Sequence, residues 1–257
     1  MKFSSIFFIS IFFLFQACTS KVNFDATLPP VVMVQSDLLL SEISTAINTD
    51  PNANGTRTHY VELYNGTGNS TDLSNYAIGY LAVTDTATLS NFTFPTSTFF
   101  ITLRGNLTNG KCYVIASPQA DPIVIKRDTI WGTTSTTAAA ASSPLQLSGN
   151  SAIALLKKDA SGTQNLGGVM YRIIDVFGSP LVPRVTSLGA TSTRNNIMWT
   201  IAGETRDTRN RTFWRKISVK DPTVDWATAK GTTTDNGQWR MSADRAWDYT
   251  NIGLPSM

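Results

Sequence analysis

Short apolar runs separated by polar turns make up most of the chain after residue 37. Residues 60–65 alternate, with Val61 and Leu63 on one face and Glu62 and Tyr64 on the other, as expected of a strand with one buried face. Further strand-like runs lie at residues 38–43, 77–83, 91–94, 99–103, 111–116, 151–156 and 172–177, with turn signals at residues 109–110, 149–150, 159–162 and 178. Helical periodicity is almost absent apart from one turn around residues 118–128, so the pattern predicts an all-β sandwich.

The N-terminus carries a secretion signal. Lys2 precedes the apolar run 3–15, which is too short to span a bilayer but suits the central region of a signal peptide. The run ends at Ala17-Cys18, which resembles a bacterial lipobox, where the peptide is cut before a cysteine whose thiol receives a diacylglycerol. We therefore expect lipidation of Cys18. Ordinary cleavage near Ala17 or Ser20, with Cys18 incidental, is the alternative.

The chain is thus expected to have three parts. Residues 1–17 form a lipoprotein-type signal peptide, residues 18–37 a flexible lipid-anchored tether, and residues 38–253 the β-sandwich domain. No later segment approaches membrane-spanning length in the sequence. The expected location is the bacterial cell envelope, with the membrane as a partner through the lipid on Cys18.

The amino-acid composition excludes several kinds of active site. The chain is 42% hydrophobic and 15% charged, which is ample for a packed core. His59 is the only histidine, which excludes sites built from several histidines, and no G-x-S-x-G elbow accompanies it. If Cys18 carries lipid, Cys112 is left unpaired in an apolar strand. We interpret Cys112 as a core thiol and not as a nucleophile.

One loop resembles the front of a calcium-binding loop. Residues 50–55 (DPNANG) match D-x-[DN]-x-[DN]-G, with oxygen ligands from Asp50, Asn52 and Asn54. The glutamate that completes the motif is displaced by one residue, to Glu62, and a one-residue slip in a strand reverses the face of the side chain. A calcium site and a plain polar turn both stay open, and no other cofactor is expected.

Basic residues concentrate late in the chain, although the net charge is only +3. Between Arg184 and Lys220 there are eight basic and two acidic residues, so this stretch carries +6 and the remainder −3. Residues 206–216 interleave arginines with aromatic side chains, which suits an anionic polymer or protein partner. The candidate contacts are Arg206, Arg209, Arg211, Arg215 and Lys216. A solvated hairpin, partly paired with Asp207 and Asp221, is the alternative.

Two further groups of residues are interpreted as structural. Glu42 and Glu62 lie on strand-like runs and suggest the acid–base pair of a glycosidase, but solvated or salt-bridged strand carboxylates are the simpler interpretation. Four of the six tryptophans fall in the C-terminal segment, where they are expected to anchor long loops on the sandwich.

Several short motifs follow one another in a fixed order. They are LLSEI at 39–43, VELYN at 61–65, DLSNY at 72–76, YVIA at 113–116, LQLSGNSAIAL at 145–155 and IDVFG at 174–178, followed by a tail of Arg, Ser, Trp and Asp residues that ends near Gly253. This order resembles the lamin tail domain family, an immunoglobulin-like module of nuclear lamins and of many secreted bacterial proteins. Two departures are a longer segment at 179–211 and an enlarged loop before Tyr60.

The resemblance implies an immunoglobulin-like β-sandwich with long irregular C-terminal loops. Most motif residues are expected to serve packing, with inward faces supplied by Leu63, Ile78, Val114, Ile153, Leu155, Ile174 and Val176, and a turn held by Asp72 and Ser74. The expected function is non-catalytic: a binding, adhesion or structural module of the envelope, with no sign of sequence-specific nucleic-acid binding. Because lamin-tail modules are often attached to secreted enzymes, a metal-dependent nuclease or phosphoesterase, or an accessory subunit of one, is the alternative.

Overall fold

The computed structural model describes the domain that begins at Val34. The described residues are 34–46, 58–82, 94, 99–120, 125–132, 145, 147, 151–179, 200–204, 208, 210–243 and 248–254. Within them, no helix is long and apolar enough to cross a membrane. Cys18 lies outside the described residues, as do Asp50, Asn52, Asn54, Arg206 and Arg209.

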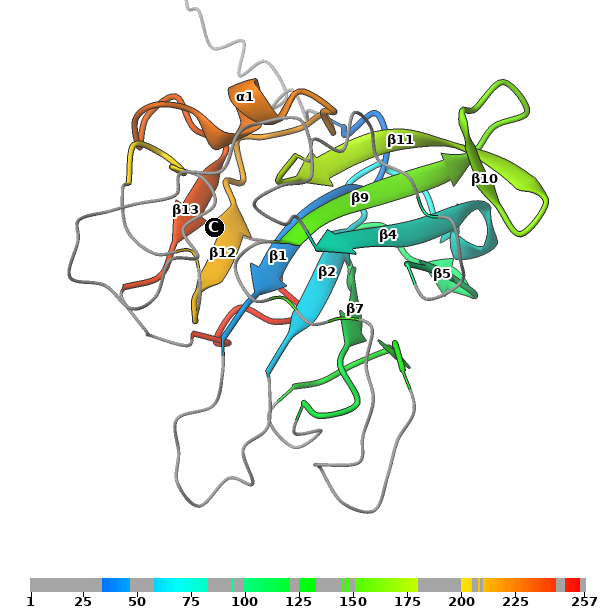
Figure 1. Cartoon of the computed structure of the whole chain (residues 1–257), viewed down its shortest axis with the longest axis horizontal. Helices are drawn as coiled ribbons and strands as arrows, with labels where there is room; N and C mark the ends of the chain where they lie inside the picture. Colours follow the sequence, from blue (N-terminus) through cyan, green and yellow to red (C-terminus); the bar gives the residue numbers. More distant parts are fainter. Residues whose placement is uncertain are drawn as a thin grey trace, which may run out of the picture. The chain divides into compact units, whose positions relative to one another are not determined.

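The first sheet has six strands in the order β13-β12-β1-β2-β7-β8. Their bounds are β1 Leu39–Ser44, β2 Tyr60–Tyr64, β7 Cys112–Ala116, β8 Thr129–Ile130, β12 Thr212–Arg215 and β13 Trp239–Met241. All neighbours are antiparallel except β7 and β8. The C-terminal strand β12 therefore lies beside the first strand of the domain, as Figure 1 shows.

The second sheet has five strands in the order β10-β11-β9-β4-β5. Their bounds are β4 Tyr76–Ala82, β5 Phe100–Thr102, β9 Ser151–Lys158, β10 Gln164–Leu166 and β11 Val169–Phe177. A short ladder joins β3 (Thr71–Asp72) to β6 (Asn106–Leu107), and a 3₁₀ turn spans Leu73–Asn75. The one α-helix among the described residues, α1 (Trp226–Lys230), is capped by the Asp225 side chain.

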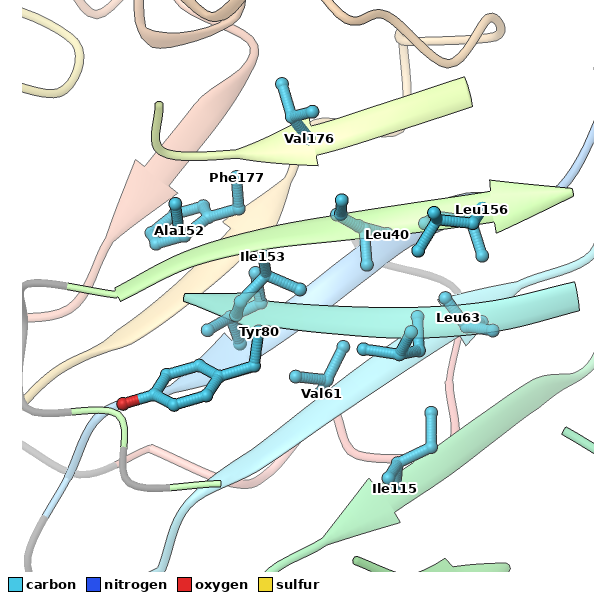
Figure 2. Packing of buried hydrophobic residues seen from close by; sticks show 14 of the residues in the cluster. Leu40, Val61, Leu63, Tyr80, Ile115, Ala152, Ile153, Leu156, Val176 and Phe177 are labelled. Atoms are coloured by element: carbon cyan, nitrogen blue, oxygen red, sulfur yellow. The ribbon is translucent and has the colours of Figure 1, made fainter. Parts of the chain in front are cut away.

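The core fills the space between the two sheets (Figure 2). Leu40, Val61 and Leu63 face it from the first sheet, and Ile153 and Val176 face it from the second. At one end Phe177 packs against the rings of Phe213, Trp226 and Trp239. This pairing of two antiparallel sheets over one apolar layer is the immunoglobulin-like sandwich that the sequence predicts.

Most predicted strands are confirmed, with differences in the C-terminal part. Predicted segment 91–94 lies mostly outside the described residues, and Phe94 is not in a strand. The sequence predicts no elements at β10, β12, β13 and α1, because these elements are too short to show a hydrophobic period. Residues 121–124 of the helical turn expected at 118–128 lie outside the described residues, and the described start of that segment is a simple turn in which the Ala120 N–H donates to the Ser117 carbonyl. Six of the seven predicted inward-facing residues lie in the main core, whereas Val114 belongs to a second cluster on the outer face.

The domain starts earlier than the predicted boundary at residue 38. Gln35 and Gly66 exchange two hydrogen bonds, at 3.0 and 2.7 Å. Asp37 accepts from the Tyr76 hydroxyl at 2.6 Å and from the Lys157 ammonium at 2.7 Å. Residues 34–37, the last four of the tether predicted at 18–37, are therefore part of the folded unit, while residues 18–33 lie outside the described residues. By contrast, the turn predicted at Asp72 is confirmed, since its carboxylate accepts from the Ser74 amide and hydroxyl.

We expect Gly162→Ala to destabilise the β9–β11 hairpin by about 1–3 kcal/mol. A Cβ at Gly162 would lie 2.1 Å from the Tyr171 carbonyl oxygen, so a backbone strand would have to move. Thermal unfolding of the variant measures the effect, and the neighbouring exposed substitution Thr163→Ala is the control. Equal melting temperatures for Gly162→Ala and the control would contradict this close approach.

Candidate functional site

Two glutamates face each other across β1 and β2. The strand register pairs Glu42 with Glu62, and both side chains point away from the main core, which Val61 and Leu63 face. Both residues are 0% exposed. No ion pair joins either of them to a basic residue in the described part of the chain. The expectation of solvated or salt-bridged carboxylates is therefore wrong: they are a buried pair of carboxyl groups.

Hydrogen bonds hold most of the pair's oxygens. The Tyr60 hydroxyl donates to Glu42 Oε1. The Ser41 hydroxyl donates to Glu62 Oε1 at 2.6 Å, and the Gly253 amide donates to Glu62 Oε2 at 2.7 Å. Glu42 Oε2 has no hydrogen-bond partner among the described residues. The two carboxyl groups are thus held by strands β1 and β2 and by the C-terminal segment.

Burial sets the protonation of this pair. Burial, together with the nearby Glu62 charge, raises the pKa of Glu42 from 4.5 to about 8. Burial also raises the pKa of Glu62, to about 7, although the hydrogen bonds from Ser41 and Gly253 oppose the shift. Glu42 is consequently mostly protonated at neutral pH, which relieves the repulsion between two buried carboxylates.

The C-terminal segment, residues 248–254, lies over this outer face of the first sheet. Its Asp248 amide donates to the Thr212 hydroxyl at 3.2 Å, and its Gly253 amide reaches Glu62. Ile252 packs on the second apolar cluster, which consists of Tyr60, Val114, Ala116, Ala120 and Ile125. A glycosidase pair must reach a substrate and a water molecule. The two glutamates reach neither, because strands and this segment enclose them.

A buried ion pair joins the two sheets on the other side of the first sheet. Arg215 of β12 donates to both carboxylate oxygens of Asp175 on β11, at 3.1 and 3.4 Å, and both side chains are at most 1% exposed. Asp175 also accepts from the amides of Leu40 and Thr223, at 2.9 and 3.0 Å. The Arg215 guanidinium lies over the Trp239 ring, 4.9 Å from its centroid. The buried ion pair of Asp175 was not predicted, although an aspartate inside the apolar run IDVFG is a signal for a buried, paired carboxylate.

The prediction that Arg211 and Arg215 contact an anionic partner is wrong, because both side chains are buried. Arg211 is 0% exposed and donates to the Ser242 carbonyl at 2.6 Å. Arg215 is held by Asp175 between the sheets. Lys216 remains near the surface, where its ammonium binds the carbonyls of Thr234 and Asp235. Arg211, directly before β12, and Arg215, at the end of β12, are therefore buried and do not belong to an exposed basic surface.

Glu62 is also a poor candidate for the predicted calcium site. Both of its oxygens accept hydrogen bonds from the protein, and it is fully buried. Its proposed co-ligands Asp50, Asn52 and Asn54 lie outside the described residues. Over the described ranges, no group of three or more His, Cys, Asp or Glu residues is arranged to hold a metal ion.

Neither the histidine nor the described cysteine is placed for nucleophilic chemistry. Burial and the neighbouring Glu62 raise the pKa of the Cys112 thiol well above its ordinary value, which disfavours the reactive thiolate. Cys112 is half-buried, so it is less enclosed than the predicted core thiol. His59 is buried, and its Nδ1 accepts from the Leu147 amide at 3.0 Å.

Comparison with known proteins agrees with this architecture. The model of the lamin tail domain family matches residues 34–170, which is more than half of the chain. No curated protein matches the sequence significantly. A crystal structure of a DUF4876 family protein from Bacteroides thetaiotaomicron VPI-5482 is similar, with a TM-score of 0.41 and 13% identity, covering 86% of this chain and 72% of that one. The family match ends within β11, while β12, which contributes Arg215, completes the sheet beyond it. The chain belongs to the lamin tail domain family.

Proposed function

We propose that the protein is a non-catalytic envelope module that binds or holds a partner while a lipid on Cys18 anchors it to the membrane. The observation that carries the non-catalytic part is the use of its polar side chains. Glu62 holds the C-terminal segment, Asp175 and Arg215 join the sheets, and His59 holds the Leu147 backbone. These four described side chains are thus engaged in supporting the sandwich.

The membrane part of the proposal follows from the N-terminal sequence. Cys18 follows Ala17 at the end of an apolar run, as in a lipobox. A diacylglycerol contributes two acyl chains, and two lipid chains give stable membrane attachment where one gives only reversible binding. Residues between Cys18 and Val34 would connect the lipid to the folded unit, so the sandwich would act as a tethered binding surface.

Metabolic labelling tests the anchor. We expect cells that express the full chain to incorporate radioactive palmitate into the protein, and Cys18→Ser to abolish incorporation and release the protein from the membrane fraction. Cys112→Ser is the matched control, because Cys18 and Cys112 are the only cysteines. Labelling that persists in Cys18→Ser, or no labelling of the parent chain, would refute the anchor.

A further inference from the structure

A small cavity lies where β12 separates from β1. The two strands pair only over Glu42–Ser44, next to a β-bulge between Leu40 and Glu42. After Arg215 the chain turns, since the Val219 amide donates to the Lys216 carbonyl at 2.9 Å. The cavity left beside β1 has a volume of about 130 Å³. Bulges of this kind often lie next to binding sites, because they interrupt a ladder and redirect side chains.

The walls of this cavity combine cations with aliphatic side chains. Leu39, Ile217 and Val219 supply apolar surface, and Ile217 is 59% exposed. Lys216 and Lys220 also line the cavity. Two acidic groups that contact wall residues are already engaged, since Asp175 pairs with Arg215, and Glu62 accepts from Ser41. A ligand in the cavity therefore meets positive charge beside an apolar surface.

Arg215, which also lines the cavity, carries a buried donor without an acceptor among the described residues. Its two terminal nitrogens bind Asp175, but its Nε has no acceptor within the described part of the chain, and the side chain is 1% exposed. A buried N–H without an acceptor costs about 1–3 kcal/mol, so such a group normally finds a partner in water or a ligand. Arg215 lines the cavity, which is the adjacent space from which an acceptor can come.

We propose that this cavity binds the carboxylate of a small aliphatic acid, with Arg215 and Lys220 facing the carboxylate and Leu39 and Ile217 facing the hydrocarbon. Its volume is close to that of a cavity of about 150 Å³ that holds benzene, so the ligand has roughly six heavy atoms or is the end of a larger molecule. This site rests on the proposed binding role and is independent of the lipid anchor at Cys18.

Ligand-observed NMR on the detergent-solubilised full chain tests the chemistry of the site. Isobutyrate is the probe and its neutral isostere isobutyramide is the comparison. We expect isobutyrate to bind with a Kd of about 1 mM and isobutyramide about tenfold more weakly, because only the acid carries the charge that the cations recognise. Equal binding of the two compounds, equal binding of inorganic phosphate and isobutyrate, or no binding of isobutyrate would overturn the proposal.

Matched variants locate the site. Ile217→Asp introduces a negative charge at an exposed position of the cavity wall and should weaken isobutyrate binding about tenfold. Val169→Asp makes the same change at a 42% exposed position on β11, outside the cavity wall, and should leave binding unchanged. Lys220→Gln should weaken binding about threefold, whereas Lys158→Gln on β9 should not. Equal binding by Ile217→Asp and Val169→Asp would contradict the site, whatever the result of labelling at Cys18.

Discussion

Replacing Asp175 with alanine is expected to lower the free energy of unfolding by about 3–5 kcal/mol. The substitution leaves the Arg215 guanidinium buried without its carboxylate. It also removes the acceptor of two backbone amides, those of Leu40 and Thr223. Since these contacts connect β11 with β12 and β1, their loss separates the two sheets near Trp239. Urea denaturation followed by tryptophan fluorescence measures the change.

Two further variants separate the buried pair from ordinary salt bridges. Arg172→Ala, on the same strand, removes an exposed partner of Asp159 and should lower stability by less than about 1 kcal/mol. The double variant Asp175→Leu with Arg215→Met replaces both charges by apolar groups and should recover much of the loss. An Asp175→Ala variant as stable as Arg172→Ala would show that the sheets do not depend on this ion pair.

Glu42→Gln is expected to stabilise the protein at alkaline pH, by about 2 kcal/mol at pH 9. Because burial raises the pKa of Glu42 from 4.5 to about 8, the folded state holds a proton that the unfolded chain has already released. The contribution of Glu42 to the stability of the wild type is therefore greatest below pH 4.5, and it is lost as the pH rises from about 4.5 to about 8. Glutamine cannot ionise, so the variant avoids the loss.

The pH dependence of the difference is the diagnostic result. At pH 4, where the glutamate is protonated in both states, wild type and Glu42→Gln should differ little. Asp159→Asn is the control, because hydrogen bonds from Ser161 lower the pKa of Asp159. Above the ordinary pKa of 3.8, the ionised Asp159 therefore stabilises the fold, and its replacement by asparagine should lower the stability. A Glu42→Gln variant that is less stable than wild type at every pH would contradict the protonated pair.

Segments that alternate over a whole strand predict the strands of the sandwich and their buried faces. Short segments such as β12 predict neither. Residues 60–64 alternate over a whole strand, and each side chain lies on the predicted face. Strand β12 has only four residues, and the sequence suggests surface charge for the two buried arginines at its ends, Arg211 directly before the strand and Arg215 as its last residue. Their burial depends on partners more than thirty residues away, Asp175 for Arg215 and Ser242 for Arg211. No local pattern reports such pairings.

The burial of the two glutamates could not be predicted from the sequence for a related physical reason. Glu42 and Glu62 lie on an alternating face that in most antiparallel sheets meets solvent. Here the C-terminal segment covers that face through Gly253, 191 residues from Glu62. The sequence therefore identifies the carboxylates as strand residues but indicates neither their pairing across β1 and β2 nor their burial. The lipobox predicted at Cys18 rests on a local signal in the sequence and stays a prediction.

One assay tests the proposed non-catalytic role most directly. Detergent-solubilised full chain is incubated with DNA, RNA and phosphate esters in the presence of calcium or magnesium, and wild type is compared with Asp50→Ala and with Glu62→Gln. We expect no hydrolysis above the blank from any of the three proteins. Metal-dependent hydrolysis by the wild type, lost in a Glu62→Gln or Asp50→Ala variant that unfolds like the wild type, would contradict the account and favour a secreted nuclease or phosphoesterase.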